Sequence, residues 1–132
     1  MTDDIEPAEA RVRVAVADDS DDLRLILAEL LNASPGLQCV ACIASQRELL
    51  ASVAESQPDV LVLDLLFDGI SSLPLVPQLR ALTPRTRIVI HSGYDIEPLT
   101  TAALAGGAVA VISKGGDPEE LIAAIRRAAR DS

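Results

Sequence analysis

Five short apolar runs recur along the chain, and each is followed by a stretch with helical periodicity or helix-capping signals. Several of these runs are apolar at almost every position, which is typical of strands covered on both faces. Strands that alternate with helices predict βαβ units, a parallel sheet and right-handed crossovers. The expected strands lie near residues 12–17, 38–44, 59–64, 86–91 and 108–113.

The intervals between the strands predict five helices. Ser20 is the expected N-cap of the first helix, and Ser45 with Glu48 forms a capping-box pattern before the second. The apolar stripe of the first helix consists of Leu23, Ile26, Leu27, Leu30 and Leu31. The other helices are expected from about Ser72 to Leu82, between Asp95 and Gly106, and after the cap Asp117, with Leu121, Ile122, Ile125 and Ala129 buried.

The length of 132 residues suits a single domain. Residues 1–10 are acidic, contain Pro7 and show no sustained apolar period, so we expect a flexible tail before a domain at 11–132. Aromatic residues make up only 2% of the chain although 49% of it is hydrophobic, which predicts an aliphatic core.

The net charge of −9 argues against duplex DNA or an anionic membrane as a direct partner, because both are polyanions. The chain has no apolar run of about 18 residues, and its acidic start does not resemble a signal peptide. We therefore expect a cytoplasmic protein without a membrane partner.

Cys39 and Cys42 lie three positions apart in an expected strand. Side chains alternate in a strand, so this spacing predicts opposite faces and two buried free thiols rather than a disulfide or a metal site. His91, the single histidine, lies in an apolar strand and is interpreted as structural.

Polar residues stand where four of the expected strands end. Asp18 and Asp19 follow the first strand, Asp64 ends the third, Ser92 follows the fourth and Lys114 follows the fifth. The carboxyl ends of parallel strands open on a common crevice in which ligands bind. Clustered carboxylates repel one another, and a hard cation such as Mg²⁺ relieves the repulsion.

Four of these five residues also have an ordinary interpretation. The aspartate pair could be a solvated loop with a helix cap, Ser92 a turn residue, and Lys114 an exposed strand-end lysine. Asp64 is different, because it lies inside an apolar stretch from Pro58 to Phe67, where a charge needs a partner. The order of all five residues, rather than any one of them, favours a functional site.

The motifs VAVADDS, PDVLVLDL, SGYD and SKGGDPEELIAAIRRA give the chain a family resemblance. Between about Arg11 and Arg130 it resembles the receiver domain of two-component response regulators, most of all receivers that precede LuxR-type helix-turn-helix outputs. The resemblance implies an α/β, flavodoxin-like, doubly wound five-stranded parallel sheet, order 2-1-3-4-5, with five helices.

The resemblance also implies a role for each site residue. The acidic pair Asp18 and Asp19 would bind Mg²⁺ together with Asp64, the phosphoacceptor, and the backbone carbonyl of Leu66 would be a further metal ligand. The hydroxyl of Ser92 would follow the phosphoryl group, and the ammonium of Lys114 would neutralise it.

Three departures from the family pattern are visible. The switch position that pairs with Ser92 usually holds Tyr or Phe, and here it is Val111. The usual Met-Pro-Gly segment is replaced by 67–69, Phe-Asp-Gly, which places an extra carboxylate, Asp68, beside the site. Two glycines follow Lys114 in place of proline or an acidic loop residue.

The expected function is Mg²⁺-dependent transfer of a phosphoryl group to Asp64 from a sensor histidine kinase or a histidine phosphotransfer protein. The outcome would be a changed protein–protein surface and homodimerisation on activation, not enzymatic turnover. Val111 keeps an alternative open, namely a receiver-like binding module that works without phosphorylation. A haloacid dehalogenase-type phosphatase is disfavoured, because Leu66 stands where a second aspartate is needed.

Overall fold

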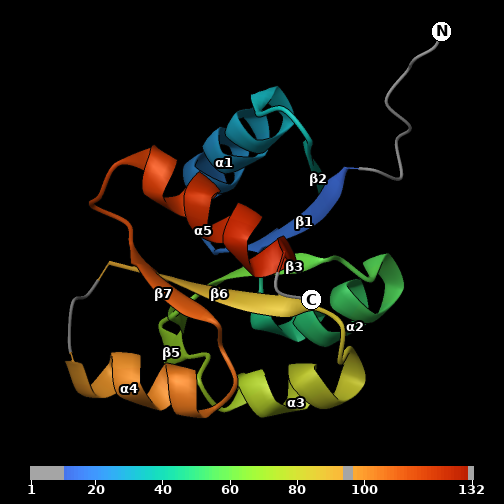
Figure 1. Ribbon diagram of the computed structural model, residues 1–132. Helices are drawn as coiled ribbons and strands as arrows, with labels where there is room; N and C mark the ends of the chain where they lie inside the picture. Colours follow the sequence, from blue (N-terminus) through green and yellow to red (C-terminus); the bar gives the residue numbers. More distant parts are fainter. Residues whose placement is uncertain (1–10, 94–96, 131–132) are drawn as a thin grey trace, which may run out of the picture.

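The structure, a computed structural model, describes residues 11–93 and 97–130. The tail expected at 1–10 lies outside the described residues. A five-stranded parallel sheet has the order β2-β1-β3-β6-β7, which is the 2-1-3-4-5 order of the expected fold once a small hairpin is set aside (Figure 1). Its strands are β1 Val12–Ala17, β2 Leu37–Ile43, β3 Val60–Asp64, β6 Arg87–Ser92 and β7 Ala110–Ser113.

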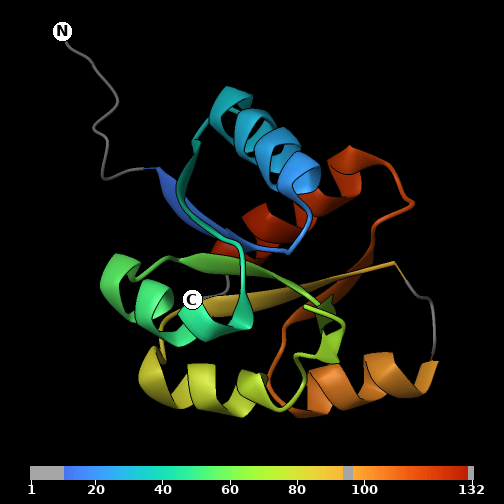
Figure 2. The ribbon, with the colours of Figure 1, turned by 180° about the vertical axis from the view of Figure 1, so that it is seen from behind.

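Helices cover both faces of this sheet. One face carries α1 and α5, and the other carries α2, α3 and α4 (Figures 1 and 2). The helices are α1 Asp21–Ala33, α2 Gln46–Ser56, α3 Leu75–Leu82, α4 Glu97–Ala105 and α5 Pro118–Arg130. This doubly wound arrangement leaves the carboxyl edge of the sheet open for a site.

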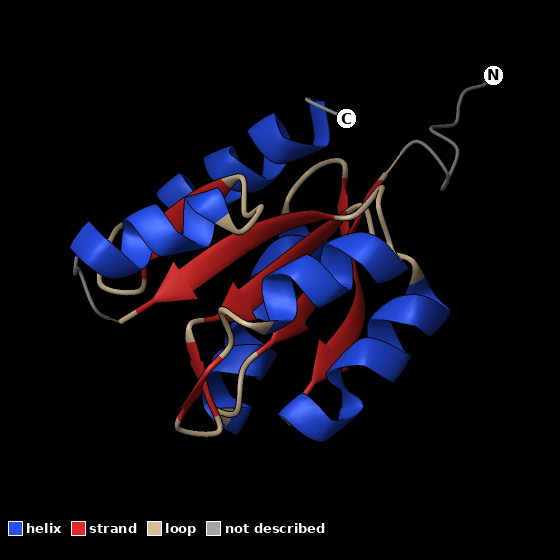
Figure 3. Cartoon of the chain, turned by 90° about the horizontal axis from the view of Figure 1, so that it is seen from below, coloured by secondary structure: helices blue, strands red, loops and turns tan. Residues whose placement is uncertain are grey.

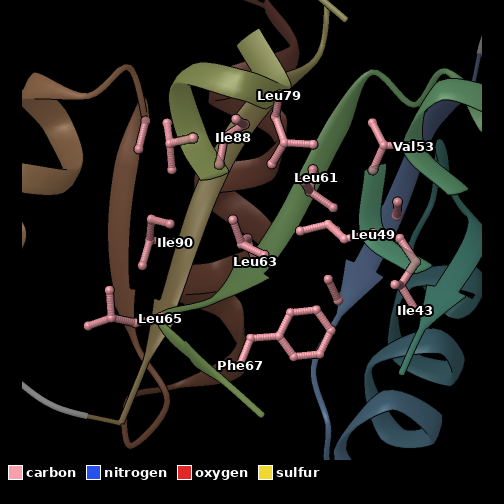
Figure 4. Close-up of a cluster of buried hydrophobic side chains, with 14 of the residues drawn as sticks. Ile43, Leu49, Val53, Leu61, Leu63, Leu65, Phe67, Leu79, Ile88 and Ile90 are labelled. Atoms are coloured by element: carbon pink, nitrogen blue, oxygen red, sulfur yellow. The ribbon is translucent and has the colours of Figure 1, made fainter. Parts of the chain in front are cut away.

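Side chains that alternate along the strands fill two aliphatic cores. On the α2–α4 face, Leu61 and Leu63 of β3 and Ile88 and Ile90 of β6 are fully buried in one cluster with Phe67 and with side chains of α2 and α3 (Figure 4). On the α1–α5 face, the core is built from valines of β1 and β3 and from leucines and isoleucines of the two helices. Aliphatic side chains therefore make up almost all of both cores, as expected from the low aromatic content.

A two-stranded antiparallel hairpin, β4 Leu66–Phe67 and β5 Ile70–Ser71, was not predicted. It follows β3 directly and projects beside the carboxyl edge of the sheet (Figure 3). The five main strands begin and end within two residues of their expected limits, whereas α3 begins at Leu75, three residues later than expected.

The helix caps agree with the sequence in two cases and differ in one. Ser20 accepts the Leu23 N–H at 3.2 Å, and Asp117 accepts the Glu119 N–H at 2.9 Å, so both expected caps are confirmed. Ser45 lies at the N-cap of α2, but its side chain makes no capping hydrogen bond, so the predicted capping box is wrong.

The expected apolar stripe of α1 is also only partly correct. Leu27 and Leu31 are buried against the sheet, and Leu23 and Leu30 pack beside them. Ile26 is 57% exposed, because it lies on the side of the stripe that does not contact the sheet. No helix in the described ranges is long and apolar enough to cross a bilayer.

The prediction that Cys39 and Cys42 point to opposite faces is wrong. The pairing of β1 with β2 contains a bulge, so Val14 pairs with Cys39 and Val16 pairs with Cys42. The two positions are two apart on β1 but three apart on β2, and the extra residue reverses the alternation. As a result, the two Sγ atoms lie 3.7 Å apart on the side of α1.

Candidate functional site

The strand ends bring the predicted site residues to one edge of the sheet. Asp18 follows β1, Asp64 is the last residue of β3, Ser92 is the last residue of β6, and Lys114 follows β7. Because these strands are adjacent and parallel, their ends lie side by side.

Three carboxylates form the centre of the site. Ligand oxygens of Asp18, Asp19 and Asp64 all lie within 4.8 Å of one another. Asp18 is 2% exposed and Asp64 is 5% exposed, whereas Asp19 is open to solvent. The carboxylates of Asp18 and Asp64 therefore lie on the buried side of the cluster, where a charge needs a partner, and that of Asp19 lies on the solvent side.

Lys114 holds the two buried carboxylates together. Its Nζ lies 2.8 Å from Oδ2 of Asp18 and 3.1 Å from Oδ1 of Asp64. Burial lowers the pKa of Lys114, but hydrogen bonds to both carboxylates outweigh that effect and raise the pKa above its usual value. The lysine is therefore fully charged at neutral pH.

Asp64 has the opposite balance. Burial raises the pKa of its carboxyl group, the hydrogen bond from Lys114 lowers it, the charge of Asp18 raises it again, and the Leu66 N–H lowers it. The result is a pKa above the usual value. The carboxylate is thus poorly solvated and incompletely neutralised, which suits a group that bonds to an electrophile or a cation.

Backbone contacts fix the position of the two buried aspartates. Oδ1 of Asp18 accepts the Ser20 N–H at 2.9 Å, and the Asp18 carbonyl accepts Nη1 of Arg24 at 2.8 Å. The Asp64 carbonyl accepts the buried hydroxyl of Ser72 at 2.7 Å. Ser72 and Arg24 were not singled out from the sequence, because they support the backbone of the site rather than supply its chemistry.

Asp68, the extra carboxylate, lies beside the site, but its carboxylate is hydrogen-bonded to the start of α2. Its Oδ2 accepts the Gln46 N–H at the start of α2 at 2.9 Å, and its own N–H donates to Oδ2 of Asp19 at 3.2 Å. Nε2 of Gln46 also donates to the carbonyls of Phe67 and Ile70. Gln46 was missed at the sequence level, because its partners lie in the unpredicted hairpin.

The donor set fits a hard divalent cation. Three carboxylates face one ammonium, so the cluster keeps an excess of negative charge that Lys114 alone does not neutralise. Oxygen donors in this number, with one side open to solvent, match the preference of Mg²⁺ for one or two carboxylates and several waters. Within the described ranges, this is the one group of three or more potential ligand residues.

Ser92 and the switch position lie on one face of the sheet. Ser92 pairs with Ser113 and Ile90 pairs with Val111, so Ser92 and Val111 both fall on the side of α3 and α4. Ser92 is buried, and its carbonyl accepts the Lys114 N–H at 2.7 Å. Val111 packs against the core on this face.

His91 is buried beside the site on the opposite face from Ser92. It is 6% exposed, and its Nδ1 atom has no hydrogen-bond partner. Burial and the nearby charge of Lys114 lower its pKa from 6.5 to about 4, with Asp18 opposing the shift. His91 is therefore neutral at physiological pH, which agrees with the structural role inferred from the sequence.

A family comparison agrees with this geometry. Residues 14–126 match the family described as the response regulator receiver domain. The chain belongs to this family. The match includes β1 from residue 14 onward, the other four strands of the sheet and all of the predicted site residues.

Curated relatives of this receiver domain have different names and activities. It is 36% identical to a protein-glutamate methylesterase/protein-glutamine glutaminase of Myxococcus xanthus, over 89% of this chain and 37% of the relative. It is 31% identical to the uncharacterized transcriptional regulatory protein YxjL of Bacillus subtilis, over 91% of this chain and 55% of the relative. The chain thus spans about half or less of these curated relatives.

Solved structures support the same fold. A LuxR-family two-component response regulator from Aurantimonas superposes with a TM-score of 0.86 at 26% identity, covering 92% of this chain and 86% of that one. The response regulator domain of Thermotoga maritima CheB superposes with a TM-score of 0.80 at 25% identity, covering 91% and 97%. The expected receiver fold and the similarity to LuxR-type receivers are both confirmed.

Proposed function

We propose that this receiver domain accepts a phosphoryl group on Asp64 from a sensor histidine kinase or a histidine phosphotransfer protein. The observation that carries the proposal is the placement of Asp64, which is buried at a strand end, in contact with Lys114 and clustered with two further carboxylates. A carboxylate so placed is a nucleophile toward phosphorus, and its surroundings supply positioning and charge rather than further covalent chemistry.

In the proposed transfer, an oxygen of Asp64 forms a bond to phosphorus while the bond between phosphorus and the donor imidazole nitrogen breaks. Asp18, Asp19 and Asp64 would hold Mg²⁺, with the Leu66 carbonyl as the further ligand that the family resemblance implies, and the ion would neutralise charge on the phosphoryl oxygens. The ammonium of Lys114, which contacts the unphosphorylated Asp64 carboxylate, moves toward the phosphoryl group. The Ser92 hydroxyl donates a hydrogen bond to one of the phosphoryl oxygens.

The acyl phosphate then changes the balance between conformations of the sheet face that carries Ser92 and Val111, which lies next to α3 and α4. This shift of population changes a protein–protein surface, with homodimerisation as one outcome. The chain itself signals rather than turns over a substrate. A binding module independent of phosphorylation is not favoured, because the chain belongs to the receiver family and its carboxylates and lysine are assembled.

The test is phosphorylation by a small donor. Incubation with acetyl phosphate and Mg²⁺ is expected to add one phosphate mass per chain, lost on treatment with hydroxylamine, as for an acyl phosphate. Asp64→Asn removes the nucleophile and is expected to abolish labelling, while Asp68→Asn, which changes a nearby carboxylate outside the cluster, retains it. Labelling that persists in Asp64→Asn, or no labelling of the parent, would contradict the proposal.

A further inference from the structure

The β4–β5 hairpin bears on two of the groups expected to bind the metal. Asp68, in its turn, donates its N–H to Oδ2 of Asp19 at 3.2 Å. Leu66, in its first strand, has the carbonyl that the family resemblance implies as a further metal ligand. The position of the hairpin therefore affects how the Asp19 carboxylate and the Leu66 carbonyl are presented to a cation.

This hairpin is too short to hold its position by itself, because each strand has only two residues. Its turn has a defined shape, since Asp68 and Gly69 both have a positive φ, 61° and 73°, as a tight two-residue turn requires. Phe67 anchors the first strand, because its side chain is fully buried in the core. The tip of the hairpin, from which Asp68 reaches Asp19, depends on a further contact.

Gln46, the first residue of α2, makes that contact. Its Nε2 donates to the carbonyls of Phe67 at 2.8 Å and Ile70 at 3.1 Å, and these two residues pair across the hairpin. Its backbone N–H donates to Oδ2 of Asp68 at 2.9 Å. The side-chain amide thus uses both of its N–H groups on the two strands, and the backbone holds the turn.

The hydrogen bond from Asp68 prepares Asp19 for a cation without occupying it. A carboxylate has two oxygens with about four lone-pair sites, so acceptance of one N–H leaves room for a metal ion. Asp19 is exposed, so ordering its side chain has an entropic cost that an existing hydrogen bond reduces. Hydrogen-bond partners of metal-ligating carboxylates orient these ligands and affect metal affinity.

We propose that Gln46 is a positioning residue for the divalent cation. Through the hairpin, it holds the Asp68 N–H against Asp19 and fixes the strand that contains Leu66. This inference rests on the proposed metal site. Because coupling between two sites is reciprocal, cation binding in turn stabilises the contacts of Gln46, which links the metal site to the start of α2.

The first test is calorimetric titration of the folded protein with Mg²⁺, which measures a dissociation constant that a merely structural role would not move. Gln46→Ala keeps the backbone N–H but removes the side-chain amide, and it is expected to weaken Mg²⁺ binding by about tenfold. The matched control is Gln78→Ala, which removes an exposed amide whose Nε2 donates to the Pro74 carbonyl at the start of α3. It is expected to leave the dissociation constant unchanged.

Three outcomes of this titration would overturn the inference. Parent-like affinity in Gln46→Ala would overturn it and leave the metal site in place, as would an equal loss of affinity in both variants. No binding of Mg²⁺ by the parent would overturn the metal site and this inference together.

The second test uses the parent protein and so does not depend on the folding of a variant. The side-chain amide resonances of Gln46 are followed by NMR during the Mg²⁺ titration. They are expected to shift and to exchange more slowly with water as the site fills, while those of Gln78 stay unchanged. Gln46 resonances that do not respond while Mg²⁺ binds would contradict the coupling.

Discussion

Lys114 contacts two of the three clustered carboxylates, so its charge decides how much repulsion the site carries without a metal. Its position could be predicted from the sequence, because it follows an apolar strand that ends beside the others. Its distances could not, because they depend on the rotamers of a long side chain. The structure shows that Lys114 reaches both Asp18 and Asp64.

Lys114→Met is expected to leave two buried carboxylates without a positively charged partner and to lower the free energy of unfolding by about 1–3 kcal/mol in EDTA. Mg²⁺ then has more repulsion to relieve, so the gain in stability on adding Mg²⁺ is expected to be larger in this variant than in the parent. Urea unfolding with EDTA and with Mg²⁺ measures both effects. Lys114→Arg keeps the charge and is the control.

Asp19→Asn tests the same cluster from its exposed side. It is expected to reduce the Mg²⁺-dependent gain in stability with little change in EDTA, because Asp19 is a solvated member of the cluster. An equal response to Mg²⁺ in the parent, Lys114→Met and Asp19→Asn would contradict a metal site at these residues.

His91 makes the protein sensitive to acid, because its imidazole is buried in the neutral form. Its pKa is about 4 in the folded protein and 6.5 when exposed, so the unfolded chain binds more protons between these values. The contribution of neutral His91 to the free energy of unfolding is fully present above pH 6.5 and is lost as the pH falls toward 4. The loss amounts to about 3 kcal/mol at most.

His91→Asn is expected to flatten the fall in unfolding free energy between pH 6.5 and 4, whatever its effect at neutral pH. The measurement is urea unfolding across this range, in which the difference between the two curves isolates the histidine. Parallel curves for parent and variant would show that His91 does not titrate as its burial implies.

At the scale of elements, the β4–β5 hairpin joins the site to α2. Strands of two residues carry no periodicity that a sequence could reveal, so this hairpin and its contacts could not be predicted. Asp68 adopts a positive φ of 61° in its turn and accepts the first N–H of α2 in place of Ser45. A residue 22 positions away thus supplies a side-chain capping bond to α2, at the Gln46 N–H, while the capping bond that the local pattern assigned to the Ser45 side chain is not made.

Asp68→Ala is expected to destabilise the protein by about 1–2 kcal/mol, because it removes the cap of α2 and places alanine at a positive φ. Asp68→Asn keeps an acceptor and tolerates this conformation, so its effect is expected to be within about 0.5 kcal/mol. Thermal unfolding of both variants checks the pair. Equal losses would show that the charge of Asp68, not its capping bond, stabilises α2.

The position of β2 could be predicted from the sequence, but the bulge within it could not. The strand was expected at 38–44 and is observed at Leu37–Ile43, yet its one extra residue reversed the side of Cys42 relative to Cys39. No glycine or proline in this strand signals the irregularity. Faces assigned from strict alternation hold only while the register is unbroken.

For the whole molecule, the strand order and the two helical layers followed from the alternation of apolar runs with helix signals, because this alternation leaves few topologies. The coupling between the site and its surface is a different matter. Ser92 and Val111 lie on the same face, so a response to phosphorylation can pass from one to the other. Valine, however, is stiff at χ1 and has little volume to relocate.

The response to activation is therefore expected to remain local. With beryllofluoride as a phosphoryl mimic, we expect amide chemical shifts to change in the segment after Ser92 and at the start of α4, with small changes in β7 and α5. Val111→Tyr is expected to widen the response if the half-buried position accepts the ring, and Val111→Ile is the control for added volume. Large shifts throughout β7 and α5 of the parent would show that coupling does not need an aromatic side chain, because the backbone of β6 and β7 then transmits the change by itself.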